Sequence, residues 1–168
     1  SAAEALFEAE RSRTQIRPLT LDYPDITLDD AYAIQRAWVN KKRANGDEIT
    51  GYKIGLTSKA MQQAMNIDTP DFGILLSSMA YEDGAEINAA QFSDPRVEVE
   101  LAFVIKDYLE GEAVSVEQVL AATECVVPSI ELIDARSLRT DPETGYTRKV
   151  FDTIADNAAN AGYILGSE

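Results

Sequence analysis

Three glutamates in two apolar segments are the residues whose spacing most directly indicates chemistry. Glu98 and Glu100 lie two positions apart in RVEVELAFVI, and Glu131 is the isolated acid of VVPSIELID. The apolar residues of RVEVELAFVI and its lack of Pro, Gly and Asn predict a buried strand. Residues two apart in a strand point to one face, so the first two carboxylates would repel each other there. If the two strands are neighbours, all three carboxylates meet. Such a group predicts a hard divalent cation with oxygen ligands, Mg²⁺ with Mn²⁺ as a substitute.

The same glutamates also have a simpler explanation. Each could pair with an arginine or a lysine, Arg96 and Arg136 being close in sequence, or one face of each strand could be solvated. Two glutamates at alternate positions of a strand do not decide between these interpretations. From the residues alone, metal binding and ion pairing both stay open.

A lysine and an aspartate add to the chemistry. Lys53 in GYKIGLT is flanked at two positions by Gly51 and Gly55, which would let a ligand approach the backbone, and burial there would favour a working base. The alternative is a strand lysine whose amino group extends to water. Asp71 in TPDFGIL follows a proline, where capping of a turn is the ordinary explanation.

The residue types that are missing exclude several classes of function. The 168 residues include no histidine, which excludes Ser-His-Asp and Cys-His catalysis and most zinc sites. The single Cys125 lies in an apolar run and is expected to be a small buried thiol. The net charge of −14 disfavours nucleic acid and anionic membranes as partners. No apolar run reaches the ~20 residues of a membrane span, and we expect a cytoplasmic protein.

The elements that must position these residues change in type along the chain. Residues 2–13 and 27–46 have helical patterns, and Thr27 with Asp30 predicts the start of the second helix. After that, short strands alternate with Gly, Pro, Asn and Asp, and SKAMQQAMN, SVEQVLAATE and TIADNAANA predict short helices. The pattern favours an α+β fold: an N-terminal helical region, 1–46, and a β-rich catalytic region, 47–168, forming one domain overall.

Within the second region, two strands are expected to carry the glutamates, over residues 97–105 and 126–133. The polar segment 137–149 predicts an exposed loop that could close over a site. Asp156 and Asn157 are expected to orient a helix.

Five motifs occur together in one order: GYKIGLTSKAMQ, TPDFGILL, PRVEVELAFV, SIELIDAR and RKVFDTIADNAANAG. This set resembles the hydratase and decarboxylase branch of the fumarylacetoacetate hydrolase superfamily, and the likeness extends over essentially all 168 residues. The resemblance implies a mixed β-roll with an N-terminal helical region, assembled as a homo-oligomer. Family members continue past a segment like NAGYILGSE, so the C-terminal part of the family fold is expected to be absent.

The resemblance also assigns roles to residues. It implies that Glu98, Glu100 and Glu131 are Mg²⁺ ligands, that Lys53 is the active-site lysine, and that Asp71 is an acid near the substrate. The expected partner is a small 2-hydroxy-2,4-dienoate or 2-oxo-4-enoate from aromatic catabolism, hydrated to a 4-hydroxy-2-oxo acid. Within the branch, the sequence most resembles the hydratases of a dicarboxylate. The cationic residues that could hold its distal carboxylate are those of the polar loop: Arg139, Arg148 and Lys149.

Two rival functions remain at this point. Decarboxylation of a 2-oxo-hexenedioate starts from the same kind of bound 2-oxo acid, and residue chemistry does not separate it from hydration. A non-catalytic metal-binding partner subunit would bind the ion without turnover. Carbon–carbon hydrolysis of the fumarylacetoacetase type is disfavoured, because that reaction relies on a histidine-containing base.

Overall fold

The fold begins with three helices and continues into two sheets. The computed structural model describes residues 1–167, and the helices are α1 (Ala2–Ser12), α2 (Leu19–Asp22) and α3 (Leu28–Ala44). Thr27 caps α3 as predicted: its Oγ1 accepts from the Asp30 backbone N–H at 3.2 Å, and the Asp30 carboxylate accepts from Thr27 N–H at 3.0 Å. α3 ends at Ala44, just before the predicted end.

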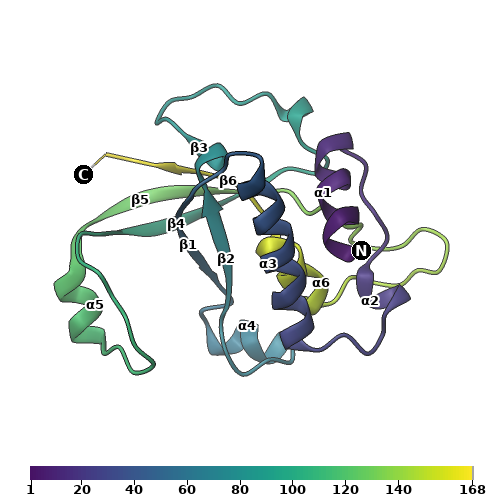
Figure 1. The fold of residues 1–168 in the computed structure, drawn as a ribbon, viewed down its shortest axis with the longest axis horizontal. Coiled ribbons are helices and arrows are strands. Elements are labelled where there is room, and N and C mark those ends of the chain that lie inside the picture. The colour runs from purple at the N-terminus through teal and green to yellow at the C-terminus, as the bar shows by residue number, and fades with distance from the viewer. Residues whose placement is uncertain (168) are drawn as a thin grey trace.

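Two sheets follow, and together they give a mixed α/β fold (Figure 1). An antiparallel pair, β1 with β2, forms the smaller sheet, and the larger sheet has the order β3-β6-β5-β4 with β3 and β6 parallel. The remaining elements, in chain order, are β1 (Ile49–Gly55), α4 (Lys59–Ala64), β2 (Asp71–Leu76), η1 (Ser77–Met79), β3 (Ala80–Tyr81), η2 (Ala89–Gln91), β4 (Arg96–Ile105), α5 (Val116–Ala122), β5 (Thr123–Ile133), α6 (Val150–Ala155), η3 (Asn157–Ala159) and β6 (Asn160–Leu165).

The hydrophobic core lies between the helices and the smaller sheet. α3 packs on α6 and α1, and α6 also contacts β2 (Figure 1). Fully buried side chains come from each of these elements: Leu6, Trp38, Leu76 and Ile154. The core therefore includes residues from both sides of position 46, and the division of the chain at that position stays a prediction. None of the helices described for residues 1–167 is both long and apolar enough to cross a bilayer.

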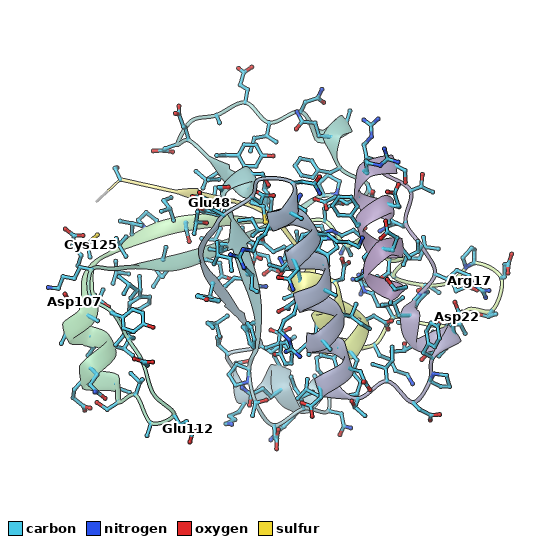
Figure 2. All side chains as sticks on the ribbon, viewed as in Figure 1. Arg17, Asp22, Glu48, Asp107, Glu112 and Cys125 are labelled. Carbon is cyan, nitrogen blue, oxygen red and sulfur yellow. The ribbon has the colours of Figure 1, made fainter. Side chains whose placement is uncertain are left out.

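Strands β4 and β5 form a long antiparallel ribbon that projects from the body, with α5 at its far end (Figure 1). Asp107, Glu112 and Cys125 lie on this projecting part, at the opposite end of the molecule from Arg17 and Asp22 (Figure 2). The prediction that β4 is buried is wrong within the described structure. The face of β4 that includes Val99 and Leu101 is exposed, Val99 by 87%, because no described segment packs against it, whereas Ala102 and Val104 on the other face are half-buried. Cys125 is half-buried rather than part of the core.

The segment TIADNAANA does not form the predicted helix over its whole length. α6 ends at Ala155, and residues 157–159 have left-handed backbone angles before β6 begins at Asn160. Strand β6 was not predicted, although it lies next to β5 in the larger sheet. By contrast, the predicted acidic strands are present as β4 and β5, each with slightly wider bounds.

Candidate metal centre

The three glutamates of the two acidic strands meet on one face of the β4–β5 ribbon. Glu98 lies directly opposite Glu131 in the antiparallel register, and Glu100 lies opposite Ser129. One carboxylate oxygen from each glutamate can be chosen so that all three lie within 4.8 Å of one another. Glu131 is 5% exposed, whereas Glu98 and Glu100 are open to solvent. The arrangement is a carboxylate cluster with one buried side and one accessible side.

The nearby arginines do not neutralise this cluster. Arg96 pairs with Asp94, with Nη2 3.1 Å from the carboxylate, and Arg136 pairs with buried Asp156, with Nε 3.5 Å away. Among the described residues, neither Glu98 nor Glu100 has an ion pair of its own. Arg96 and Arg136 therefore do not pair with these glutamates. The rest of the simpler explanation is confirmed in part, because Glu131 pairs with a lysine, Lys53, at 3.2 Å, and Glu98 and Glu100 are exposed to solvent.

Lys53 reaches the cluster from the smaller sheet. It lies on β1 opposite Gly73 of β2, and its Nζ is 3.2 Å from Glu131 Oε2. The same amino group donates to the Ala158 carbonyl at 3.5 Å. A Cβ on Gly73 would lie 3.0 Å from Lys53 Cγ and 2.7 Å from the Asn157 carbonyl oxygen, so only glycine leaves room for this arrangement. Lys53 is half-buried and faces the carboxylates instead of extending into solvent.

Asp71 lies near Lys53 and is buried. It is the first residue of β2, opposite Gly55, and a Cβ at Gly55 would collide with its Oδ1 while lying 3.4 Å from Lys53 Nζ. Among the described residues, Oδ1 of Asp71 has no hydrogen-bond partner. Burial raises the pKa of this carboxyl above its usual range, although the Lys53 ammonium opposes the rise. A buried oxygen without a partner is a position at which a ligand or a water molecule can be bound.

Glu131 is held on both of its carboxylate oxygens. Oε2 faces Lys53, and Oε1 accepts a 2.7 Å hydrogen bond from Asn160 Nδ2 on β6. Burial raises the pKa of Glu131, and the Lys53 ammonium and the Asn160 amide oppose that shift. These contacts fix the side chain of the most buried glutamate before any ion binds.

The donor set fits a hard divalent cation. All three groups are carboxylate oxygens within 4.8 Å of one another, and carboxylate oxygens are the ligands that Mg²⁺ and Ca²⁺ prefer in proteins. One ammonium faces three glutamates and Asp71, so negative charge is in excess. At this separation each carboxylate pair repels by about 1 kcal/mol at the dielectric constant of water and by about 3 kcal/mol at an effective value near 20.

The cationic residues of the polar loop 137–149 make contacts away from the carboxylate cluster. Arg148 is half-buried, and its Nη1 donates to the Ser137 carbonyl at 2.8 Å. Lys149 lies over the Tyr146 ring, 5.3 Å from its centroid, and Arg139 is exposed. The structure brings Lys53, Asp71 and the three glutamates together, and it shows no contact from the loop cations to them within residues 1–167.

Of the polar residues behind the site, Asp156 and Asn157 were named from the sequence, but only with the role of orienting a helix. Asp156 accepts from the Arg136 backbone N–H at 2.6 Å, and Asn157 hydrogen-bonds both backbone groups of Ile74. Asn160 was not singled out at all. The signal was present as DNAAN, three polar residues inside an otherwise apolar segment, and all three are buried.

The chain is similar in sequence to known hydratases. The chain is 55% identical over 164 residues to a 2-oxo-hept-4-ene-1,7-dioate hydratase of Escherichia coli, covering 98% of this chain and 61% of that protein. It is 37% identical over 166 residues to a 2-hydroxypent-2,4-dienoate hydratase of Pseudomonas putida, covering 98% of this chain and 72% of that protein. The chain thus spans about 61% of the length of the first of these relatives.

A solved structure agrees with this relationship. The 4-oxalocrotonate decarboxylase of Pseudomonas putida G7, complexed with magnesium and adipate, superposes with a TM-score of 0.90 and 32% identity, covering 99% of this chain and 61% of that one. No family model matches the sequence. With a hydratase of 37% identity covered over 72% of its length, the chain belongs to the hydratase and decarboxylase branch of the fumarylacetoacetate hydrolase superfamily.

Proposed function

We propose that this chain carries the metal and lysine site of a Mg²⁺-dependent hydratase. The reaction is addition of water to a 2-hydroxy-2,4-dienoate or its 2-oxo-4-enoate form, giving a 4-hydroxy-2-oxo acid. The preferred substrate is 2-oxohept-4-ene-1,7-dioate, because the chain has 55% identity to a hydratase of that name. The observation that carries the proposal is the meeting of Glu98, Glu100 and Glu131 beside Lys53.

The three glutamates would hold the cation, which when bound supplies Lewis-acid stabilisation of charge developing on the substrate's 2-oxygen. Mn²⁺ would be a substitute. Glu98 and Glu100 are exposed, so the substrate's carboxylate and 2-oxygen could reach the ion from the solvent side. Glu131, held from behind by Asn160, would fix the position of the ion.

Lys53 is assigned the proton transfer that converts the dienol into the conjugated ketone. Its Nζ lies 3.2 Å from Glu131, so the proton would move between the 2-hydroxyl and the carbon chain at the edge of the carboxylate cluster. Asp71 is assigned to the water that attacks the far alkene carbon. Its raised pKa makes it a stronger base than an exposed aspartate, and its unsatisfied Oδ1 is available to accept a proton.

The distal carboxylate of a dioate needs a cationic contact, which we assign to Arg139, Arg148 and Lys149. Arg139 is exposed on the loop, whereas Arg148 is committed to Ser137. The loop would have to approach the carboxylate cluster for this contact to form. We also propose that the protein has a mixed β-roll, assembles as a homo-oligomer, is cytoplasmic and acts in homoprotocatechuate degradation.

Decarboxylation of 4-oxalocrotonate is the second candidate. It is favoured by one observation, the TM-score of 0.90 to a decarboxylase of that name. Both reactions begin with a 2-oxo acid held at a divalent cation, so the carboxylate cluster serves either. Hydration is preferred because the sequence identity to the seven-carbon dioate hydratase is 55%, against 37% to a 4-oxalocrotonate decarboxylase of Pseudomonas sp. (strain CF600).

The test is an ultraviolet assay of 2-hydroxyhepta-2,4-dienedioate with and without Mg²⁺, with products identified by mass. The Glu131→Gln variant removes a proposed ligand, and Glu112→Gln, on the projecting part far from the site, is the matched control (Figure 2). The proposal predicts Mg²⁺-dependent gain of one water, lost in Glu131→Gln and retained in Glu112→Gln. Loss of carbon dioxide from 4-oxalocrotonate would move the assignment to decarboxylase. Metal binding without turnover of either would indicate a non-catalytic subunit.

A further inference from the structure

The chain reaches the candidate metal centre through an unusual turn. Asn157, Ala158 and Ala159 have φ values of +53°, +52° and +59°, three consecutive non-glycine residues in the left-handed region. L-residues with a Cβ disfavour this conformation, and it persists only where surrounding structure enforces it. The turn connects α6 to β6, and its last neighbour is Asn160, the first residue of β6. Backbone strain next to the carboxylate cluster indicates that the position of Asn160 relative to the cluster is important for the site.

Contacts on both sides enforce the turn. The Asn157 side chain accepts from the Ile74 backbone N–H at 2.8 Å and donates to the Ile74 carbonyl at 2.9 Å, as a neighbouring strand would. On the other side, the Asp134 backbone N–H donates to the Ala159 carbonyl at 2.9 Å. The turn is therefore fixed to β2 and to the segment that follows β5.

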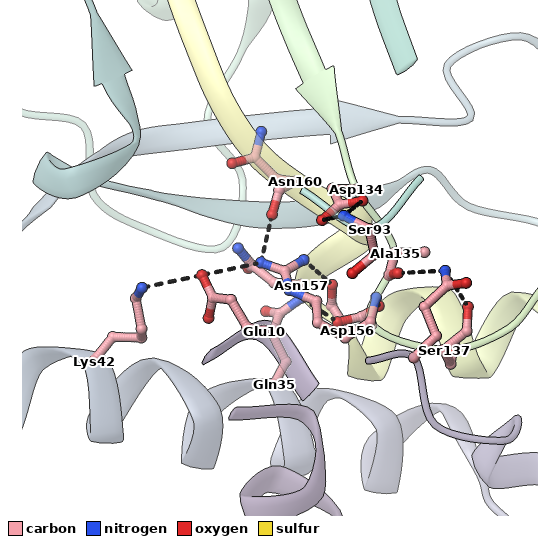
Figure 3. Close-up of polar contacts among 12 residues, drawn as sticks. Glu10, Gln35, Lys42, Ser93, Asp134, Ala135, Ser137, Asp156, Asn157 and Asn160 are labelled. Atoms are coloured by element: carbon pink, nitrogen blue, oxygen red, sulfur yellow. Dashed lines mark hydrogen bonds and ion pairs between the residues drawn. The ribbon is translucent and has the colours of Figure 1, made fainter. Parts of the chain in front are cut away.

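The carbonyl of Asn160 is also fixed. Arg136 Nη2 donates to it at 2.8 Å, and the same guanidinium contacts Asp156 and lies 4.0 Å from Glu10, which accepts from Lys42 (Figure 3). This buried network holds the backbone at Asn160 in place. The amide side chain has little freedom, because the residue is fully buried.

The side chain of Asn160 has one partner among the described residues. Nδ2 donates to Glu131 Oε1 at 2.7 Å, while Oδ1 accepts no hydrogen bond in the described part of the chain. An ionised carboxylate can only accept, so the amide must direct its NH₂ group at Glu131. The amide therefore satisfies the carboxylate of Glu131 while its own oxygen stays without a partner among the described residues, which indicates that the hydrogen bond to Glu131 determines its orientation.

We infer that Asn160 is a positioning residue for Glu131. By donating to Oε1 it orients the buried carboxylate toward Glu98 and Glu100, and it thereby raises the affinity of the cluster for a divalent cation. The left-handed turn and the Arg136 network place the amide. This inference rests on the proposed metal site, and it concerns a residue that acts through Glu131 without touching the ion.

The experiment is a titration of the chain with Mn²⁺, in which free Mn²⁺ is measured by electron paramagnetic resonance. Asn160→Ala removes the donor and is expected to weaken Mn²⁺ binding about tenfold or more, as loss of a partner to a ligand does. Glu131→Gln removes the ligand and is expected to weaken binding at least as much. Asn45→Ala is the control, because Asn45 is an exposed asparagine whose side chain donates to the Lys41 carbonyl, and this variant should bind Mn²⁺ as the wild type does.

A second variant separates donation from packing. Asn160→Leu keeps a side chain of similar volume but cannot donate, so it should bind Mn²⁺ as weakly as Asn160→Ala. All titrations are made at a temperature below the unfolding midpoint of each variant, so that the protein is folded. The spectrum of bound Mn²⁺ in both Asn160 variants should differ from the spectrum of bound Mn²⁺ in the wild type. Wild-type affinity in either Asn160 variant would overturn the inference and leave the metal site standing. Absence of Mn²⁺ binding by the wild type would instead overturn the proposed function.

Discussion

The body of the molecule and the β4–β5 ribbon have similar apolar patterns but opposite environments. In the body, α3 and α6 pack against β2 of the smaller sheet, α1 packs on α3, and Leu76 on β2 is completely buried. On the ribbon, alternate residues of β4 are also apolar, yet Leu101 is 67% exposed. A strand's own pattern therefore does not decide its burial. Burial depends on whether another element packs against it.

The candidate metal centre lies where these two regions meet. Glu131 is buried against the body, through Asn160 and Lys53, whereas Glu98 and Glu100 are on the open ribbon. The buried side fixes the geometry of the site and the open side leaves it accessible. This division suits a site that must hold an ion rigidly and still admit a substrate.

Matched leucine truncations give the largest expected difference between the regions. Leu76→Ala should lower the free energy of unfolding by about 3 kcal/mol, because it leaves a cavity in the core. Leu101→Ala should change it by less than about 0.5 kcal/mol, because the side chain is already solvated. Urea unfolding measures both. A comparable loss for Leu101→Ala would show that the ribbon face is covered in solution.

Two arginine–aspartate pairs extend the comparison to charge. Arg136→Leu should lower stability by about 3 kcal/mol, because it leaves Asp156 buried without its cation. Arg96→Leu should cost less than about 1 kcal/mol, since both partners of its pair with Asp94 are more than half exposed. Thermal and urea unfolding of the two variants would decide. Equal losses would contradict the assignment of the buried network to the body.

Alanine-to-glycine changes should cost more on the ribbon than in the turn. Ala158→Gly removes a left-handed cost of about 1–2 kcal/mol, but it loses a buried methyl worth about 0.8 kcal/mol and adds about 0.5 kcal/mol of backbone entropy cost, so almost no net change in stability is expected. Ala102→Gly, in extended β4, has no such strain to relieve and should lower stability by about 0.5 kcal/mol or more. Unfolding midpoints compare them directly. A loss above about 1 kcal/mol in Ala158→Gly would mean that the turn is not strained in solution.

The smallest effect is expected from pH. The Arg17 guanidinium holds the pKa of Asp141 well below its usual range. Because the folded-state pKa is lowered, the pair stabilises the fold above the ordinary value of 3.8 and loses this contribution as pH falls below it. Arg17 is 43% exposed, so solvent weakens the pair. Melting temperatures of wild type and Asp141→Asn should converge as pH falls toward 2, and a constant difference would contradict the pairing.

Much of the fold was accessible from local sequence signals. The Thr27 capping box marks the start of α3, because a capping box depends on residues three positions apart. Strand β6 and the left-handed turn were missed. Asn157 is held in its left-handed conformation by Ile74, 83 positions earlier: its side chain accepts from the Ile74 backbone N–H and donates to the Ile74 carbonyl. A local pattern carries no signal of such a contact.

The residues of the candidate metal centre also differ in how far the sequence could predict them. The alternation of Glu98 and Glu100 places them on one face, which follows from strand geometry, but their register with Glu131 depends on the pairing of β4 with β5. Asn160 could not be assigned from sequence, because its role depends on the orientation of a single amide toward Glu131. The prediction that β4 is buried was wrong because the sequence of an apolar strand does not show whether another element packs against it.

The central claim is that the three glutamates bind one divalent cation. The most direct test is anomalous diffraction from crystals of the protein grown with Mn²⁺. The account predicts one strong peak between the carboxylates of Glu98, Glu100 and Glu131, with Lys53 beside it. A map with no peak at the cluster, or with Mn²⁺ bound elsewhere while Lys53 still pairs with Glu131, would contradict it.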